Sequence, residues 1–363
     1  MTLEQRTSRQ LPIIYAHGTL REIGQQIGED RREQIQDSLC NAREMIEHSC
    51  ETLHLTWEAA VNQARKYMPF ASERYPQYVQ EMEGLAEGAG VSMDDLSVLT
   101  ALEAVALDAL HLSRCTSVAA NQDCTADGHV LVGHNETWMP EDEPDVYLIH
   151  AQPSDEAPFL AMSYGGLLPN VGFNAHGIAQ CCDTMYPNDI RIGIPRVIVS
   201  RAVLNACSIT EAIKCTIAPL RAAGYNHLIA HDSGELFNVE VSARSFAILY
   251  GEEGYLAHAN HYLDPGMRRI EKDPEDLVSA HVRYHRAVRL LRATRAHNLD
   301  TFTDLLRDHV NYRFSICNHG IFGAPLDREK TIASVIMDLT ERKLWAAWGN
   351  PCENAYFAYA LNC

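Results

Sequence analysis

The period of the hydrophobic pattern changes at Cys115, and this change limits the folds that are open to the chain. Upstream, apolar residues such as Ile23, Ile27 and Ile35 recur at helical spacings amid charged residues. Downstream, short β-rich runs such as 146–149 alternate with turn residues. The sequence therefore predicts a mostly helical segment that is joined at Cys115 to a body of mixed strands and helices.

Capping and breaking residues divide the helical segment. The expected elements are a strand at 11–16, a helix from Thr19, a helix over 57–67, a helix from Pro76 to the glycines at 88–90, and a long apolar helix through Leu112. Ser92 and Asp95 match the capping-box pattern, in which a serine side chain and an acid three residues later satisfy free backbone amides. The last helix is therefore expected to begin there.

The body contains two groups of strands with helix pairs between them. Strands are expected at 130–132, 146–149, 159–162, 171–173, 178–181, 227–230, 236–241, 246–250, 255–258, 331–337, 343–348 and 355–361. Helices are expected at 195–206, 210–218, 280–293 and 301–307. This order indicates an α+β fold with four layers, in which helices cover the outer faces of two stacked sheets. A doubly wound parallel sheet fits less well, because the strands come in hairpin-like clusters.

Composition excludes several classes of function. The formal net charge of −18 disfavours nucleic acid and anionic membranes as partners, because phosphate binding needs an excess of Lys and Arg. We expect a cytoplasmic protein with free thiols, since the eleven cysteines form no disulfide framework and no secretory signal is recognisable. No CxxC pair, HExxH motif or Cys/His run at zinc spacing occurs, so the sequence predicts no metal site.

Cys115 is the strongest candidate for a catalytic residue. A thiol nucleophile needs a base within hydrogen-bond reach, and an N-terminal cysteine carries its own in the α-amino group, whose pKa is about 7.7–8.0. Attack of the thiol on the Arg114 carbonyl, followed by hydrolysis of the resulting thioester, would release that amine. Arg114–Cys115 is therefore a candidate self-cleavage site. The alternative is that Cys115 is a buried apolar filler, as many free cysteines are.

Several short stretches resemble the isopenicillin N acyltransferase family and occur in the order seen there. They are His17-Gly18-Thr19, Cys115-Thr116-Ser117, Gly133-His134-Asn135, the stretch 170–174, His258-Ala259-Asn260-His261 and Phe314-Ser315-Ile316-Cys317. The resemblance implies an N-terminal nucleophile (Ntn) hydrolase with an αββα fold and a mostly helical N-terminal segment. It also implies a precursor that cleaves itself into residues 1–114 and 115–363, which stay associated as one structural domain.

The resemblance also implies roles for individual residues. Cys115 is the expected nucleophile, and Asn260 matches the asparagine of the oxyanion hole. Thr137 stands where family members commonly carry an aspartate beside the cysteine amine; Glu136 or Glu141 is a candidate to supply the missing carboxylate.

Two further positions depart from the family pattern. Asn318 replaces a frequent arginine, which predicts a different substrate choice. Arg114 replaces a frequent glycine before the nucleophile, which predicts slower processing or a different geometry of cleavage.

The remaining candidate pocket residues are polar side chains near these motifs. They are Asn135, Glu136, His258, His261 and Asn318. For the two histidines a structural role in the core is the alternative. One of Cys181 and Cys182 is a further candidate to face the site. A Cys-His-Asn protease is disfavoured, because no local signature of such enzymes surrounds any cysteine.

The resemblance implies an acyltransferase or amidohydrolase that forms or breaks a non-peptide amide bond through a Cys115 thioester. The expected partners are a small-molecule acyl donor and an amine or amide, the two associated cleavage fragments and, as an open question, further copies of the chain. No resident cofactor is expected, with acyl-CoA as a candidate donor substrate. The alternatives are a strict amide hydrolase and a degenerate member that keeps the fold as a binding protein.

Overall fold

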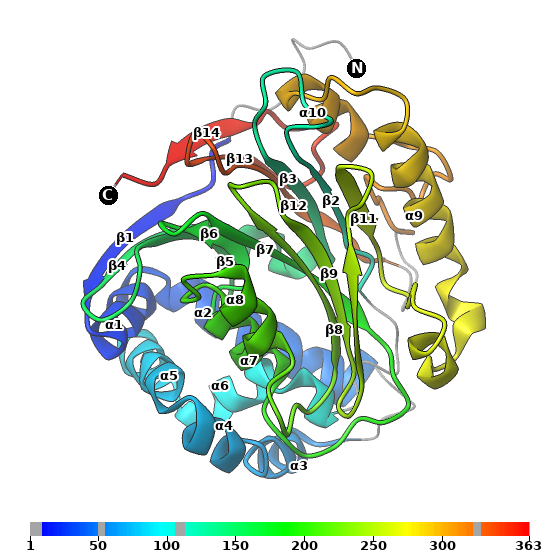
Figure 1. Cartoon of the computed structure of the whole chain (residues 1–363). Helices are drawn as coiled ribbons and strands as arrows, with labels where there is room; N and C mark the ends of the chain where they lie inside the picture. Colours follow the sequence, from blue (N-terminus) through cyan, green and yellow to red (C-terminus); the bar gives the residue numbers. More distant parts are fainter. Residues whose placement is uncertain (1–8, 50–54, 106–112, 322–327, 363) are drawn as a thin grey trace.

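Two β-sheets are stacked face to face in the computed structural model, which describes residues 9–49, 55–105, 113–321 and 328–362 (Figure 1). The larger sheet has eight strands in the order β1-β4-β5-β6-β7-β8-β9-β10, and the smaller has six in the order β11-β2-β3-β12-β13-β14. Neighbouring strands pair antiparallel in both sheets, except β1 and β4, which are parallel.

The strands lie close to the predicted runs. The eight-stranded sheet consists of β1 (Ile13–Gly18), β4 (Val146–Pro153), β5 (Phe159–Tyr164), β6 (Val171–Asn174), β7 (Ile178–Met185), β8 (Gly224–His231), β9 (Leu236–Val241) and β10 (Phe246–Tyr250). The six-stranded sheet consists of β2 (Thr116–Ala120), β3 (Leu131–Trp138), β11 (Tyr255–His258), β12 (Lys330–Asp338), β13 (Lys343–Trp348) and β14 (Phe357–Ala360).

The main core lies between the two sheets. Val132 and Val335 of the six-stranded sheet belong to the same buried apolar cluster as Leu148, Leu160 and Phe173 of the eight-stranded sheet. Each such side chain contributes about 1.5–3 kcal/mol when it leaves water. Strand alternation then directs the remaining side chains of these strands to the outer faces, where helices cover them.

Helices form the two outer layers. The helices of the body are α7 (Arg196–Val203), α8 (Ile209–Thr216), α9 (Val278–Leu291) and α10 (Leu299–Leu306). Phe302 of α10 packs in one cluster with Val118 and Ile336 of the six-stranded sheet. The N-terminal helices, together with α7 and α8, cover the eight-stranded sheet. The order of helix, sheet, sheet and helix confirms the predicted four-layer αββα fold.

The N-terminal helices begin and end largely at the expected capping residues. They are α1 (Leu20–Asp30), α2 (Arg32–Glu44), α3 (Trp57–Ala64), α4 (Met68–Arg74), α5 (Pro76–Ala89) and α6 (Met93–Thr100). Thr19 and Glu22 form a capping box before α1, and Ser92 caps α6. Gly90 ends α5 with a φ of +68°, a conformation that costs glycine little.

The structure corrects three predictions for this segment. The helix that was expected to continue through Leu112 ends at Thr100 and is followed by a 3₁₀ turn over 102–105; residues 106–112 lie outside the described part. An apolar run in the sequence does not by itself determine where a helix ends. The helix from Thr19 is broken at Arg31 into two. The first strand spans 13–18 rather than 11–16, and it pairs with β4, so the N-terminal segment adds a strand to the larger sheet.

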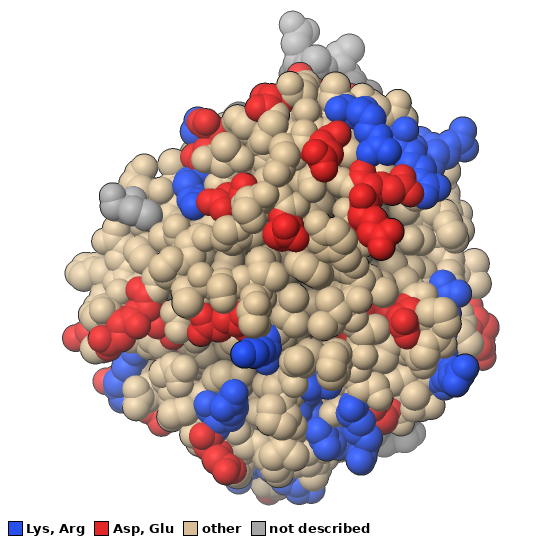
Figure 2. Space-filling model, viewed as in Figure 1, with Lys and Arg blue, Asp and Glu red and all other residues tan. Residues whose placement is uncertain are grey.

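Charge is distributed in small groups on the surface. On the face in Figure 2, acidic and basic side chains of the described residues are interspersed among uncharged ones. Many of them pair, as Arg292 does with Glu253 at 3.2 Å. Within the described ranges, no helix has the length and apolar character that a bilayer crossing requires.

Candidate active site

Cys115 lies directly before β2, between the two sheets. Pairing of β2 with β3 and β11 fixes its backbone, and only 2% of the residue is exposed. Cys115 lines a small cavity of about 30 Å³. The other residues that line this cavity are Thr100, Leu102, Ser113, Glu136, Trp138, Tyr164, Leu167, Asn170, Cys182, Thr184, Arg196, Val197 and Tyr225.

The thiol is surrounded by polar groups of β3 and of its own segment. The Thr137 amide donates a hydrogen bond to Sγ at 3.4 Å, and the Ser113 hydroxyl lies 3.3 Å from Sγ. Sγ lies 3.6 Å from Oε1 of Glu136, which can accept the thiol proton. Burial raises the pKa of Cys115 well above its usual value, and the charges of Glu136 and Asp183 add to this effect. The thiol of the intact chain is therefore protonated at neutral pH.

A chain of hydrogen bonds leads away from Glu136 into the core. Its Oε2 lies 3.0 Å from Nε2 of His134, and Nδ1 of His134 lies 2.9 Å from the Ser117 hydroxyl. That hydroxyl donates to Asp183 at 3.0 Å, so Nδ1 of His134 must donate to the Ser117 oxygen. A second proton then lies between His134 and Glu136. The other oxygen of Glu136 faces the thiol.

Arg283 of α9 links Cys115 to Asn260. Its Nη1 donates to the Cys115 carbonyl oxygen and, at 2.9 Å, to the Thr116 hydroxyl, while its Nη2 donates to Oδ1 of Asn260 at 2.9 Å. Burial and the nearby Arg114 lower the pKa of Arg283 to about 10, which leaves it charged at neutral pH. Sequence reasoning missed this arginine.

A signal for Arg283 is nevertheless present in the sequence. The buried positions of α9 are Ala280, Arg283, Ala287 and Leu291, which are spaced by three, four and four residues. Arg283 therefore occupies the apolar face of the helix. A buried arginine on such a face needs polar partners, so it marks a site that sequence inspection could single out.

Asn260 is 1% exposed and lies next to the cavity wall. Its Nδ2 donates to the carbonyl oxygen of Thr184, a cavity residue, at 3.1 Å, and its Oδ1 is held by Arg283. An amide nitrogen carries two protons, so one remains beyond the bond to Thr184. The structure thus fixes the orientation of the Asn260 amide.

The two predicted histidines lie deeper than the cavity. Nε2 of His258 lies 2.9 Å from Glu240, and its Nδ1 lies 3.5 Å from Asp183. Burial disfavours the charged ring, but these carboxylates outweigh it and raise the pKa of His258 to about 9. Burial and the charge of His258 lower the pKa of His261 to about 2. The ring of His261 lies 3.9 Å from that of His281, centroid to centroid.

Other predicted residues also face away from the cavity. The side chain of Asn135 donates to the carbonyl oxygens of Leu306 and Ile316, both at 2.9 Å, on the α10 side of the sheet. That of Asn318 donates to the Glu329 carbonyl oxygen at 2.7 Å. Strand alternation explains the first case, because Asn135 and Glu136 are neighbours on β3 and so point to opposite faces.

The residues around the scissile bond complete the site. Thr137 contacts the thiol through its backbone, and its buried hydroxyl has no hydrogen-bond partner within the described residues. The guanidinium of Arg114 is paired with Glu329 and lies 4.4 Å from the centroid of the Phe314 ring. Both the charge and the plane of this side chain are therefore held in place.

A second cavity of about 90 Å³ adjoins the first, and both are lined by Leu102, Trp138, Tyr164 and Leu167. Glu141, Asp142 and Arg328 also line it. Glu141 pairs with Arg328 and is not among the residues in contact with the thiol, so Glu136 is the carboxylate at Cys115. Burial raises the pKa of Asp142 to about 6.

Two groups of side chains in the described ranges have the composition of a metal site. Ligand atoms of Cys115, His134 and Glu136 lie within 4.8 Å of one another. Both ring nitrogens of His134 are already engaged, so this group is a hydrogen-bonded chain. The other group, around Cys317, lies apart from the cavity.

A match to a family profile shows which protein family the chain belongs to. The profile described as acyl-coenzyme A:6-aminopenicillanic acid acyl-transferase matches residues 123–353. The chain belongs to this family. The resemblance found in the sequence motifs is thereby confirmed.

The curated proteins that are similar to this chain include a transferase and a hydrolase. The 40 kDa form of acyl-coenzyme A:6-aminopenicillanic-acid acyltransferase from Emericella nidulans is 24% identical over 345 residues, which cover 93% of this chain and 92% of the relative. The β-alanyl-dopamine/carcinine hydrolase of Drosophila melanogaster is 25% identical over 259 residues, which cover 64% and 65% of the two chains. The similarity thus extends to enzymes of both reaction types.

The comparison with solved structures also matches an acid amidase and a penicillin acylase. An ortholog of N-acylethanolamine-hydrolyzing acid amidase from Caenorhabditis elegans has a TM-score of 0.46 and 12% identity, covering 62% of this chain and 93% of its own. Penicillin V acylase from Agrobacterium tumefaciens has a TM-score of 0.46 and 14% identity, covering 64% and 83%.

Proposed function

We propose that this acyltransferase family member is an Ntn-type enzyme that forms or breaks a non-peptide amide bond of a small molecule through a Cys115 thioester, after cutting its own chain before Cys115. One observation carries the proposal. The Cys115 thiol borders a cavity while contacting both a backbone N–H donor and a carboxylate.

The first step is self-cleavage. Glu136 accepts the thiol proton, and Sγ attacks the carbonyl carbon of Arg114. The peptide C–N bond breaks, the Cys115 nitrogen leaves as an amine with that proton, and a thioester joins residues 114 and 115. One water molecule then hydrolyses the thioester, which gives the Arg114 carboxylate and a free thiol. Arg283 supports this step, because it holds the Cys115 carbonyl while Glu329 holds the Arg114 side chain.

The freed amine then serves as the base for substrate turnover. Its pKa of about 7.7–8.0 suits proton transfer at neutral pH far better than a buried thiol does on its own. Sγ attacks the substrate carbonyl, the amine carries the proton to the leaving group, and a thioester forms. The second N–H of Asn260 is the proposed donor to the developing oxyanion, a role worth about 2.7–4 kcal/mol.

The acceptor of the acyl group decides between hydrolysis and transfer. Water gives an acid, whereas an amine gives a new amide. The curated relatives represent both outcomes, one named as an acyl-coenzyme A:6-aminopenicillanic-acid acyltransferase and one as a β-alanyl-dopamine/carcinine hydrolase. Acyl-CoA suits the donor role because exchange of one thioester for another is nearly even in free energy. Release of CoA only when an amine is supplied would identify a transferase; cleavage of amides without CoA would identify a hydrolase.

Intact-mass measurement tests the proposal. We expect the purified chain to give two fragments with a boundary between Arg114 and Cys115, and Cys115→Ala to stay at full length. Cys182→Ala is the matched control, because Cys182 lines the same cavity and should leave cleavage intact. A wild-type chain that stays at full length and whose Cys115 resists iodoacetamide would contradict the proposal and favour a binding protein.

A further inference from the structure

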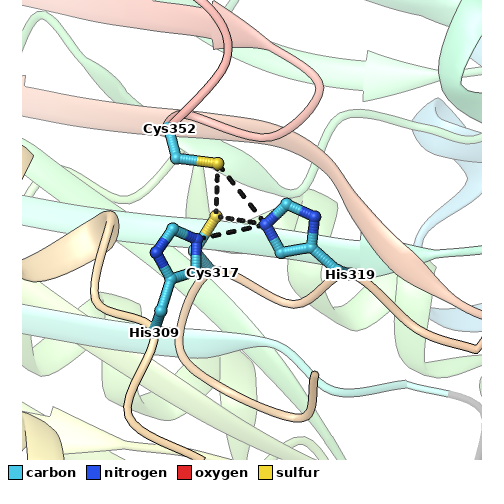
Figure 3. A group of neighbouring side chains, drawn as sticks. All are labelled: His309, Cys317, His319 and Cys352. Atoms are coloured by element: carbon cyan, nitrogen blue, oxygen red, sulfur yellow. Dashed lines mark hydrogen bonds between the residues drawn. The ribbon is translucent and has the colours of Figure 1, made fainter. Parts of the chain in front are cut away.

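Four side chains with metal-binding atoms converge outside the active-site cavity. His309, Cys317 and His319 come from the segment after α10, and Cys352 comes from the turn after β13. Figure 3 shows the four side chains pointing toward one another from these two segments. Their ligand atoms all lie within 4.8 Å of one another.

The separations match the edges of a zinc tetrahedron. Bonds of about 2.3 Å to sulfur and 2.0–2.1 Å to nitrogen give edges of about 3.8 Å between sulfurs, 3.5 Å between sulfur and nitrogen and 3.3 Å between nitrogens. The two Sγ atoms are 3.6 Å apart, and Nε2 of His319 lies 3.6 Å from Cys317 and 3.4 Å from Cys352. The Nε2 atoms of His309 and His319 are 3.1 Å apart.

The surroundings hold these ligands in place. The Asn350 side chain donates to Sγ of Cys317 at 3.4 Å, a contact that stabilises a thiolate. The two segments are also joined directly, since Arg307 donates to the Pro351 carbonyl oxygen at 2.7 Å. Cys317 is buried whereas His309 is exposed, so an ion can enter from the His309 side. Both cysteines are free thiols.

We propose that His309, Cys317, His319 and Cys352 bind one structural Zn²⁺ ion. Two thiolates and two neutral imidazoles form a closed tetrahedral set, which soft divalent Zn²⁺ prefers and which leaves no position for substrate. The two thiolates balance the charge of the ion. Binding releases the thiol protons, and the resulting bonds join the segment after α10 to the turn after β13.

The site supports the neighbourhood of the scissile bond. Phe314, beneath the Arg114 guanidinium, lies between His309 and Cys317 in the sequence. Asn318, between two ligands, holds the backbone of Glu329, the partner of Arg114. The role of zinc in positioning Arg114 depends on the proposed self-cleavage. The binding of zinc at this site does not depend on that proposal.

Metal analysis of the full-length protein tests the site. Protein purified without chelators should contain about one zinc ion per chain. After replacement by Co²⁺, its spectrum should show the intense visible bands of tetrahedral cobalt and a near-ultraviolet thiolate charge-transfer band. Cys352→Ser and His319→Ala should each weaken zinc binding by at least the roughly 10–100-fold that loss of a residue orienting a ligand causes, and lose these bands or shift them.

Matched controls separate this site from the rest of the chain. Cys40→Ser removes an exposed cysteine of α2, and Cys115→Ala removes the other cysteine-containing group as well as the proposed cleavage. Both should keep a full zinc equivalent. Wild-type protein that binds neither Zn²⁺ nor tetrahedral Co²⁺ would overturn the proposal even if the variants fail to fold. A Cys317–Cys352 disulfide in non-reduced peptide maps, or full zinc in Cys352→Ser, would overturn it as well.

Discussion

The proposed mechanism requires Cys115 to lose its proton at a site where only 2% of the residue is exposed. Its burial raises the thiol pKa, and the charge of Glu136 raises it further. The same carboxylate lies 3.6 Å from Sγ, so it is also the group to which the proton can move. The Glu136 carboxylate can therefore act as the base even though its charge disfavours a free thiolate. The proton transfer neutralises the carboxylate as the sulfur attacks.

Replacement of Glu136 tests this role. We expect Glu136→Gln to slow self-cleavage by about 100-fold or more, since an amide cannot accept the thiol proton and general bases contribute about 10²–10⁴-fold. The rate is measured from the loss of full-length chain over time. Glu141→Gln is the control, because Glu141 pairs with Arg328 away from the thiol. Cleavage of Glu136→Gln at the wild-type rate would exclude Glu136 as the base.

The sequence could identify site residues only where a local motif carries them. Cys115, Glu136 and Asn260 stand in or beside short recognisable stretches, and the structure places the first two on the cavity. Arg283 lies 168 residues from Cys115 in the chain, and no motif surrounds it. The proposed zinc ligands form no local motif for a similar reason. Cys317 and His319 are close in sequence, but Cys352 joins them only through the fold.

At the scale of elements, α1 and α5 approach so closely that backbone meets backbone. A Cβ atom on Gly84 would overlap the Arg21 carbonyl oxygen, and one on Gly24 would overlap that of Glu81. Gly28 and Gly88 are equally confined one turn further on. These four glycines therefore fix how α5 crosses α1, the helix that packs against β1, at the cost of helix propensity.

Gly84→Ala tests this crossing. Alanine normally stabilises a helix interior by about 1 kcal/mol relative to glycine, but here the methyl group must push the helices apart. We expect a net loss of about 2 kcal/mol in the free energy of unfolding, measured by urea titration. Gln80→Ala, at an exposed position of α5, should change it by less than about 0.5 kcal/mol. Equal effects of the two substitutions would show that the close contact does not limit stability.

The elements themselves were largely predictable, whereas some of their ends were not. The capping box at Thr19 and the glycine after α5 have local causes that can be read from the sequence. The end of α6 at Thr100 has no such mark, because the apolar run continues beyond it. The parallel pairing of β1 with β4 joins segments more than 130 residues apart. Tertiary packing determines such helix ends and long-range strand pairings, and the local hydrophobic pattern does not predict them.

At the scale of the whole molecule, a buried polar network joins the two sheets. His258 of β11 belongs to the six-stranded sheet, whereas Asp183 of β7 and Glu240 of β9 belong to the eight-stranded sheet. Asp183 also accepts a hydrogen bond from Ser117 of β2, two residues after Cys115. Loss of the positive charge on His258 would leave two buried carboxylates without this partner, and this penalty grows with burial.

This network predicts how stability changes at alkaline pH. Because folding raises the pKa of His258 from 6.5 to about 9, its contribution is fully present below pH 6.5 and is lost as the pH rises through 9. The contribution corresponds to about 3 kcal/mol. We therefore expect the difference in unfolding free energy between the parent and His258→Gln to shrink by about that amount between pH 6 and 10.

Urea titrations in a Cys115→Ala background measure this difference, so that every molecule is a single chain. Gln80→Ala, at an exposed position of α5, is the control; because neither side chain titrates, its difference from the parent should not change with pH. Groups that titrate in both proteins, such as tyrosines and the other cysteines, cancel in each comparison. If the curves for the parent and His258→Gln instead run parallel from pH 6 to 10, His258 is neutral in the fold, and the attraction between the sheets must have another source.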